Sequence, residues 1–311
     1  MREGDQWVEV KAVEGTPQGE LALIQLALRD EAYRTAVRRV KAFRRNYPVD
    51  YRREDAAMLA GHAQMARGYY MKAHEWYVRQ LDEFPAGDLQ NESLQRELDI
   101  ANAFLAGRNQ VWEVCGVWSL EIVRLSATGE AIEILMQIAE RAPGSELAEK
   151  ALMRIGDYYF DEENYRRAAE AYDEYLVMFP GSAKVPFARS ARAQLRAARA
   201  VYTTYRSAKY DSTPLIDAEL RFRNYRADYP DRVRADGIEA ILVEIANRRA
   251  EADYYVAELF ERLDRPKAAA FYYNQAAKRY GQTLWTARAE AEAKRLGYAE
   301  PAPKGQPPAQ P

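Results

Sequence analysis

Residues 145–182, SELAEKALMRIGDYYFDEENYRRAAEAYDEYLVMFPGS, decide the fold of this chain of 311 residues. The stretch reads as two helices joined by a short acidic turn, because large apolar residues such as Leu152 and Ile155 recur three or four positions apart. Gly156 on the first helix and Ala168 on the second are small. Small residues at these positions predict two helices that cross closely, with aromatic rings filling the space on either side.

The same helix ending recurs along the chain, where an aromatic or apolar residue is followed by Pro or Gly. These endings are Tyr47-Pro48, Phe84-Pro85, Ala142-Pro143, Phe179-Pro180, Tyr229-Pro230 and Tyr280-Gly281. Twelve residues before each closing Pro or Gly stands an alanine, and four residues after each alanine stands an apolar or aromatic residue. The alanines are Ala36, Ala73, Ala131, Ala168, Ala218 and Ala269, and their partners are Val40, Tyr77, Leu135, Tyr172, Phe222 and Tyr273. This register is typical of the tetratricopeptide helix hairpin.

A single hairpin of this type cannot bury its own apolar face, so successive hairpins should stack. We therefore predict an all-α fold, a tetratricopeptide-like α-solenoid of about six helix hairpins plus a C-terminal capping helix. The composition agrees, with 30% charged residues, 48% hydrophobic residues and only 16 glycines. The net charge of -2, with both signs interspersed, does not favour nucleic acid or an anionic membrane as a partner.

The expected hairpins divide the chain into four regions. We predict a flexible leader at 1–17, N-terminal hairpins at 18–144, C-terminal hairpins continuous with them at 145–298, and a disordered Pro-rich tail at 299–311. In the C-terminal region, 233–263 is expected to form one helix of about 30 residues, and Asp211 or Ser212 is placed to cap the helix before it.

An insert at 106–126 interrupts the N-terminal hairpins. Residues 111–125, VWEVCGVWSLEIVRL, are rich in Val and Trp, and favour either a short helix or a strand-like elaboration. The insert either pads the side of the array or docks a partner. It contains Cys115, the single cysteine of the chain, so no intramolecular disulfide is possible and the compartment cannot be read from redox chemistry.

Signals for a membrane or for export are missing from the residues themselves. No apolar run approaches the roughly 20 residues that a membrane helix needs. The first residues, MREGDQWVEV, contain neither the hydrophobic core of a signal peptide nor a cysteine for lipid attachment. We therefore expect either a cytosolic protein or one whose export segment has been removed.

The sequence shows no pattern that predicts catalysis. His62 and His74 fall on opposite helices of the second hairpin, and neither has a Cys or a carboxylate at metal-ligand spacing. Cys115 has no signature of an activated nucleophile, and the chain has neither a glycine-rich phosphate loop nor a GxSxG elbow. We expect no enzymatic activity, no cofactor and no metal.

Binding is the function that remains. The first helices of stacked hairpins line a concave face that holds peptides or partner elements. The register places seven residues on this face: Leu21, Gln25, Met58, His62, Met65, Met153 and Asp157. The methionines near His62 would suit an adaptable apolar peptide site. The alternative is that these residues form ordinary core between repeats.

A second candidate surface is a basic stripe formed by Arg189, Arg192, Arg196 and Arg199, which recur three and four residues apart. The stripe is either a solvated face or an electrostatic contact for an acidic partner protein, which would set the rate and orientation of association. Nucleic acid is not favoured, because aromatic residues do not interleave with these arginines.

Three segments together resemble the family of the outer-membrane protein assembly factor BamD and its lipoprotein relatives. They are DYYFDEENYRRAAEAYDEYLVMFPGS at 157–182, YDSTPL at 210–215 before a helix ending in DYP, and RRAEADYYVAELFERLDRPKAAAFYYNQAAKRYG at 248–281. In that family a long helix with a Tyr-rich end, here Tyr254 and Tyr255, turns into an Ala-rich helix, here Ala268 to Tyr273. The resemblance covers roughly residues 18–296.

The resemblance implies a chain of tetratricopeptide hairpins anchored by an N-terminal lipid at the periplasmic face of the outer membrane, as a non-enzymatic part of the machine that inserts β-barrel proteins. The N-terminal hairpins would receive unfolded barrel segments, and the C-terminal hairpins would dock other assembly subunits. The membrane would be contacted only through a lipid anchor. The alternative is a general tetratricopeptide adaptor that binds peptides of soluble partners in the periplasm or cytosol.

Overall fold

The structure is a computed structural model of the chain that describes residues 2–3, 6–7, 15–108, 127–180 and 187–297. The chain forms two compact units, residues 1–155 and 156–311, and the division falls inside helix α7. Each unit is considered by itself. The predicted tail and residues 109–126 of the predicted insert, with Cys115, lie outside the described residues.

The first unit consists of helices packed in pairs, and short turns join consecutive helices except between α5 and α6, which residues 106–127 separate. Its elements are β1 (Arg2–Glu3), β2 (Gln6–Trp7), α1 (Pro17–Arg29), α2 (Tyr33–Asn46), α3 (Arg53–Ala66), α4 (Tyr70–Glu83), α5 (Gln90–Leu105), α6 (Thr128–Arg141) and the first ten residues of α7 (Glu146–Asp161). The two-residue strands pair with each other inside the predicted leader. Helices α1 and α2, α3 and α4, and α5 and α6 form three hairpins, in each of which the two helices contact each other.

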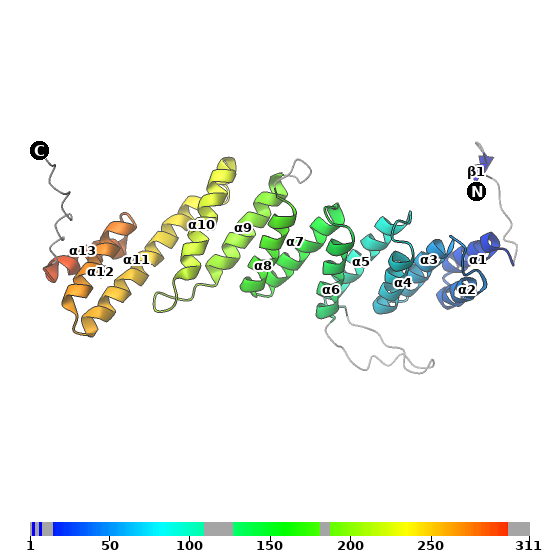
Figure 1. Ribbon diagram of the computed structural model, residues 1–311, viewed down its shortest axis with the longest axis horizontal. Coiled ribbons are helices and arrows are strands. Elements are labelled where there is room, and N and C mark those ends of the chain that lie inside the picture. The colour runs from blue at the N-terminus through cyan, green and yellow to red at the C-terminus, as the bar shows by residue number, and fades with distance from the viewer. Residues whose placement is uncertain (1, 4–5, 8–14, 109–126, 181–186, 298–311) are drawn as a thin grey trace, which may run out of the picture. The chain divides into compact units, whose positions relative to one another are not determined.

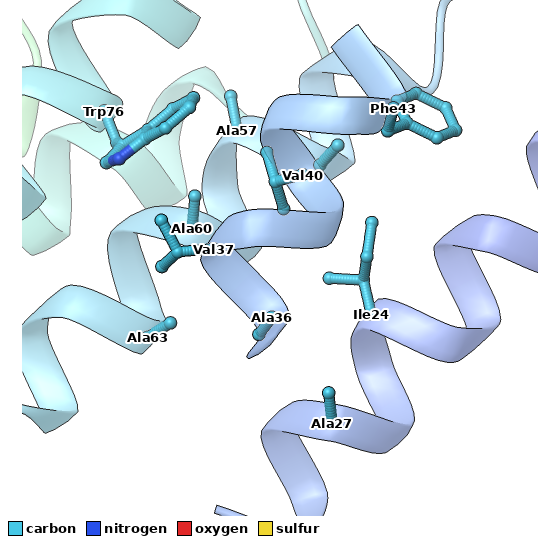
Figure 2. Close-up of a cluster of buried hydrophobic side chains, with 11 residues drawn as sticks. Ile24, Ala27, Ala36, Val37, Val40, Phe43, Ala57, Ala60, Ala63 and Trp76 are labelled. Atoms are coloured by element: carbon cyan, nitrogen blue, oxygen red, sulfur yellow. The ribbon is translucent and has the colours of Figure 1, made fainter. Parts of the chain in front are cut away.

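The core of the first unit lies where consecutive hairpins meet. Ile24 of α1 faces Ala36 and Val40 of α2, and alanines of α3 pack against the other side of α2 (Figure 2). Trp76 of α4 covers this cluster at one end. Small residues on α3 let the backbone of that helix approach α2 closely, so hairpins one and two share one apolar layer.

The second unit repeats the same arrangement. Its elements are the rest of α7, α8 (Tyr165–Met178), α9 (Phe187–Thr203), α10 (Thr213–Asp228), the 3-10 turn η1 (Pro230–Arg232), α11 (Ile238–Arg262), α12 (Pro266–Arg279) and α13 (Leu284–Arg295). Helix α13 packs on both α12 and α11 and covers the end of the last hairpin (Figure 1). The ring centroid of its Trp285 lies 5.2 Å from that of Tyr254 and 5.8 Å from that of Tyr255.

The alanine register predicted from sequence is confirmed, since every one of the six alanines is completely buried. Their partners four residues later are buried as well, with exposed fractions of 0 to 1%. The predicted class, an all-α tetratricopeptide-like α-solenoid of six hairpins with a C-terminal capping helix, is confirmed by these elements. The predicted close approach at Gly156 is also present, because a Cβ atom there would lie 2.6 Å from the ring of Tyr172.

One helix differs from its predicted bounds. The residues from 233 onward were expected to be helical through 263, but α11 begins only at Ile238. Gly237 precedes it with a φ of 70°, in the left-handed region, and a helix cannot pass through that conformation. Of the two residues expected to cap α10, Ser212 occupies the N-cap position without a side-chain hydrogen bond, whereas the Asp211 carboxylate accepts hydrogen bonds from the backbone N–H of Thr213 at 2.9 Å and from its hydroxyl at 2.6 Å.

Candidate protein-binding surfaces

Helices α3 and α5 of the first unit present polar and thioether side chains side by side. Glu54 of α3 brings the two helices together, because its carboxylate accepts hydrogen bonds from the Gln80 side chain at 2.8 Å and from the backbone N–H of Leu89 at 3.0 Å. Leu89 is the residue before α5. We call the resulting surface the α3–α5 face; its residues are Met58, His62 and Met65 on α3 and Glu92, Arg96 and Asp99 on α5.

Two nitrogen atoms on the α3–α5 face are buried and make no hydrogen bond. They are Nε2 of His62 and Nε of Arg96. Nε2 of His62 lies 3.6 Å from a carboxylate oxygen of Glu92, beyond hydrogen-bonding distance. Arg96 reaches Asp99 at 3.4 Å and Glu92 at 3.8 Å through its terminal nitrogens. Buried polar groups are nearly always paired, so two unpaired atoms on neighbouring helices are unusual.

His62 is neutral near pH 7. Burial lowers its pKa, and the positive charge of Arg96 lowers it further, against the opposing effect of Glu92. The ring stands edge-on to Tyr77, with 6.0 Å between the two ring centroids. A neutral imidazole has one nitrogen that accepts a hydrogen bond and one that donates, so His62 can serve a peptide group in either sense.

The predicted groove residues differ in how deeply they are buried. Met58 is only 3% exposed, and its sulfur accepts a weak hydrogen bond from the hydroxyl of Ser93 at 3.9 Å. Met65 is half-buried, with its sulfur 3.9 Å from the Tyr77 hydroxyl. On α1, Leu21 packs partly buried against the core cluster. Gln25 on the same helix is exposed, and Met153 on α7 is half-buried.

Asp157 lies in the second unit, where it is held by two partners. Its carboxylate accepts a hydrogen bond from the Tyr172 hydroxyl at 2.6 Å and pairs with Arg192 at 2.5 Å. Burial and the neighbouring carboxylate raise the pKa of Tyr172, so the hydroxyl keeps its proton and remains a donor. The structure thus joins a predicted groove residue to a predicted docking residue, and connects α7, α8 and α9 at one carboxylate.

The other arginines of the predicted stripe also contact their own unit. The guanidinium of Arg196 lies over the ring of Phe160, 4.7 Å from its centroid. Arg199 donates to the backbone carbonyl of Asp236 at 3.4 Å. Arg189 is half-buried near the start of α9, and Arg192 is exposed over about half of its side chain. Arg192, Arg196 and Arg199 thus each contact another part of the second unit.

Glu92 and Arg96 were not among the residues predicted from sequence. Their spacing with Asp99, four and then three residues, gives one polar face of α5 and was the available signal. It was missed because α5 follows an irregular segment around Gly87, where no repeat register assigns a face.

Among the described residues, no group of three or more His, Cys, Asp or Glu side chains could hold a metal ion. The described helices also include none that combines the length and the apolar character needed to cross a membrane.

Comparisons with solved structures find other tetratricopeptide proteins at low identity. A tetratricopeptide repeat protein from Parabacteroides merdae is 13% identical over 91% of this chain and 99% of its own, with a TM-score of 0.36. PilW, a type IV pilus biogenesis factor, is 14% identical over 89% of this chain and 100% of its own, with a TM-score of 0.29. Similarities this weak say nothing about function. No curated protein matches the chain.

A family model gives the assignment. The model described as "YfiO: Outer membrane lipoprotein" matches residues 120–302, which is more than half of the chain. The match contains the three segments that carry the BamD-like resemblance, together with the whole second unit up to α13. The chain therefore belongs to the YfiO family of BamD-like outer membrane lipoproteins.

Proposed function

We propose that the chain is a non-enzymatic scaffold and peptide-binding subunit in the assembly of β-barrel proteins into the outer membrane, held at the periplasmic face of that membrane. Family membership supports the compartment. The tetratricopeptide architecture supports protein partners, because stacked hairpins offer long surfaces on which extended segments bind. The proposed partners are other assembly subunits and unfolded barrel segments.

The observation that carries the binding role is the pair of unsatisfied nitrogens on the α3–α5 face. An extended peptide offers carbonyl and N–H groups along both of its edges. Both nitrogens lie below the surface, so a peptide would first contact the exposed parts of the Arg96 and His62 side chains and would pair these nitrogens once the side chains move toward it. Leaving such atoms unpaired costs about 1–3 kcal/mol each, so a bound peptide that pairs them recovers part of that cost.

The neighbouring side chains suit a client with varied sequence. Met65 provides a flexible, polarizable surface that adapts to different apolar side chains. Glu92 and Asp99 balance the charge of Arg96, so the face as a whole does not demand a charged peptide. Recognition through the peptide backbone with only loose side-chain selection is what binding many different unfolded barrel segments requires.

The direct test is the affinity of a fluorescently labelled peptide, the last strand of an outer-membrane barrel protein, measured by anisotropy. Arg96→Ala should weaken binding by about tenfold to a hundredfold, since a hydrogen bond from a charged donor contributes roughly 1.5–3 kcal/mol. His62→Ala should weaken it less, by about threefold to tenfold. Arg38→Ala is the matched control, because this exposed arginine on α2 reaches only Thr35, at 3.5 Å.

Unchanged affinity in both face variants, or an equal loss in Arg38→Ala, contradicts the assignment of the site. The assembly role has its own test: affinity purification from a detergent-solubilised outer membrane. Recovery of a barrel-assembly subunit is expected. Recovery of soluble proteins only would favour the alternative, a general adaptor for peptides of soluble partners.

A further inference from the structure

The second unit contains a cleft of about 460 Å³ between α8, α9 and α10. Leu176 of α8 and Ala197 of α9 supply apolar walls, and Gln194, Asn224 and Asp228 supply polar ones. The volume falls within the range of ligand sites in proteins, which are typically about 300–1,000 Å³. None of these residues belongs to the α3–α5 face or to the arginine stripe.

The guanidinium of Arg221 lies in the wall of the cleft, already held by two carboxylates. Its terminal nitrogens make a two-pronged contact with Asp173, at 2.6 and 2.9 Å, and its Nε donates to Asp217 at 3.0 Å. Hydrogen bonding to Asp173 raises the pKa of Arg221, so the guanidinium stays charged throughout the physiological range. Asp173 and Asp217 thus bring two negative charges against one positive charge.

Asp228 adds a third carboxylate on the same side of α10. Gln194 donates a hydrogen bond to one of its oxygens at 3.2 Å, and the residue is exposed. Because the Gln194 side chain is neutral, this hydrogen bond does not cancel the negative charge of Asp228. The cleft with its immediate surroundings therefore holds three carboxylates and one guanidinium, and its net charge is negative. The other two arginines of α10 pair with glutamates, Arg223 with Glu219 at 2.5 Å and Arg226 with Glu239 at 3.3 Å.

We propose that this cleft binds a cationic side chain, lysine or arginine, presented by a partner polypeptide. Asp228 receives the positive head group, and the Asn224 and Gln194 side-chain oxygens can accept further hydrogen bonds from it. Leu176 and Ala197 contact the aliphatic stem, which is how long basic side chains are usually buried. An anionic ligand is disfavoured, because Asp228 would repel it and because Asp173 and Asp217 already occupy the guanidinium of Arg221.

The experiment is a titration of the whole chain, labelled with ¹⁵N, with N-acetyl-arginine amide and, in parallel, with N-acetyl-lysine amide. The side-chain NH₂ signals of Gln194 and Asn224 report on the cleft directly. Both signals should shift in a saturable manner at concentrations up to about 50 mM, since one side chain alone is expected to bind with millimolar affinity. N-acetyl-citrulline amide, which has nearly the same shape without the charge, should not shift them.

Asp228→Asn should lower the affinity for the arginine probe at least fivefold, whereas Asp231→Asn should leave it unchanged. Asp231 is an exposed carboxylate of η1 that does not line the cleft. Equal shifts with citrulline, no shift with either cation, or full affinity in Asp228→Asn would each overturn the proposal. The result is independent of the peptide assay on the α3–α5 face, so either idea can fail while the other stands.

Discussion

Two hairpins can be compared directly: that of α3 and α4 in the first unit, and that of α7 and α8, whose helices cross in the second unit. Their helices pack in the same way, but the hydrogen bonds beside the crossing differ. Each places a glycine against the ring of a tyrosine sixteen residues later. A Cβ on Gly61 would lie 2.3 Å from the ring of Tyr77, and a Cβ on Gly156 would lie 2.6 Å from that of Tyr172. The packing of the two helices is thus conserved between the two units.

The residue after the glycine differs, and so does the hydrogen bonding around it. Asp157 accepts a hydrogen bond from Tyr172 and pairs with Arg192 on the next helix. His62 stands at the equivalent position, its Nε2 has no hydrogen-bond partner, and Tyr77 turns its hydroxyl to the sulfur of Met65 instead. The second unit uses this position to connect three helices, whereas in the first unit Nε2 of His62 makes no hydrogen bond to the described residues.

Adding one methyl group at either glycine should disrupt the close crossing of the two helices. Gly61→Ala should destabilise the protein by about 2–3 kcal/mol, because the new Cβ overlaps the Tyr77 ring and a packed core does not yield easily. Gly156→Ala should behave in the same way. Gly129→Ala on α6 is the control: no atom of the described residues lies within 4 Å of its Cβ position, so it should stabilise by up to about 1 kcal/mol. Urea denaturation gives all three values, and a neutral Gly61→Ala would contradict the close crossing.

The difference at the next residue predicts unequal effects of truncation. Asp157→Ala should destabilise by about 1–2 kcal/mol, mainly because the buried Tyr172 hydroxyl loses its acceptor. Arg192→Ala should cost less, since half of that side chain is exposed and exposed ion pairs contribute little. His62→Ala removes no hydrogen bond at Nε2 and should cost less than Asp157→Ala. Equal losses at positions 62 and 157 in chemical denaturation would refute the contrast.

The turns of the two hairpins differ in the type of residue that adopts a positive φ. Gly68 has a φ of 78°, and Glu163, at the equivalent position, has a φ of 58°. The left-handed conformation costs a residue with a side chain about 1–2 kcal/mol, so Glu163→Gly should stabilise by about 0.5–1 kcal/mol once the entropy of glycine is subtracted. Glu162→Gly is the control, because Glu162 does not have a positive φ, and it should destabilise slightly. Thermal and urea unfolding of both variants distinguish the outcomes.

The smallest expected difference between the two hairpins is in how their stability depends on pH. His74 on α4 contacts the buried carboxylate of Glu97, 2.5 Å away, whereas Ala169 stands at the equivalent position of α8. Burial lowers the pKa of His74, but the hydrogen bond and charge of Glu97, with smaller effects of Glu133 and Glu75, raise it overall above its ordinary value of 6.5. Burial also raises the pKa of Glu97, against His74 and Arg141.

A raised pKa in the folded state means that folding favours the protonated histidine. Its contribution to stability is complete below pH 6.5 and is lost as the pH rises through the folded-state pKa. The free energy of unfolding of the wild type should therefore fall relative to that of His74→Ala as the pH rises from 6.5 through the folded-state pKa of His74. A difference that stays constant, or grows with pH, would contradict the assigned direction.

The sequence predicted most of the fold because the signal for it is local. Alanines such as Ala73 and Ala168 repeat at a fixed distance from a helix end, and each sits where two helices cross, so one register places every hairpin. The start of α11 was wrong by several residues because an isolated glycine inside a helical pattern does not reveal the sign of its φ.

The candidate surfaces were predictable only in part. His62 and Met65 follow from the register of α3, but Arg96 comes from a helix whose orientation depends on the Glu54 contact with Leu89. Likewise Asp157 and Arg192 are 35 residues apart, and no periodicity says which long side chains will meet. Contacts of this kind depend on tertiary geometry and on the reach of flexible side chains.

Helix α11 constrains how the second unit can open. Its 25 residues extend about 37 Å at 1.5 Å per residue, and it contacts α10 on one side and both α12 and α13 on the other. Because α11 packs against helices of both of the last two hairpins, opening of one hairpin would expose a buried face of the other. A bound protein that pulls on α12 would therefore also act on α10 through α11. We expect the C-terminal hairpins to open together.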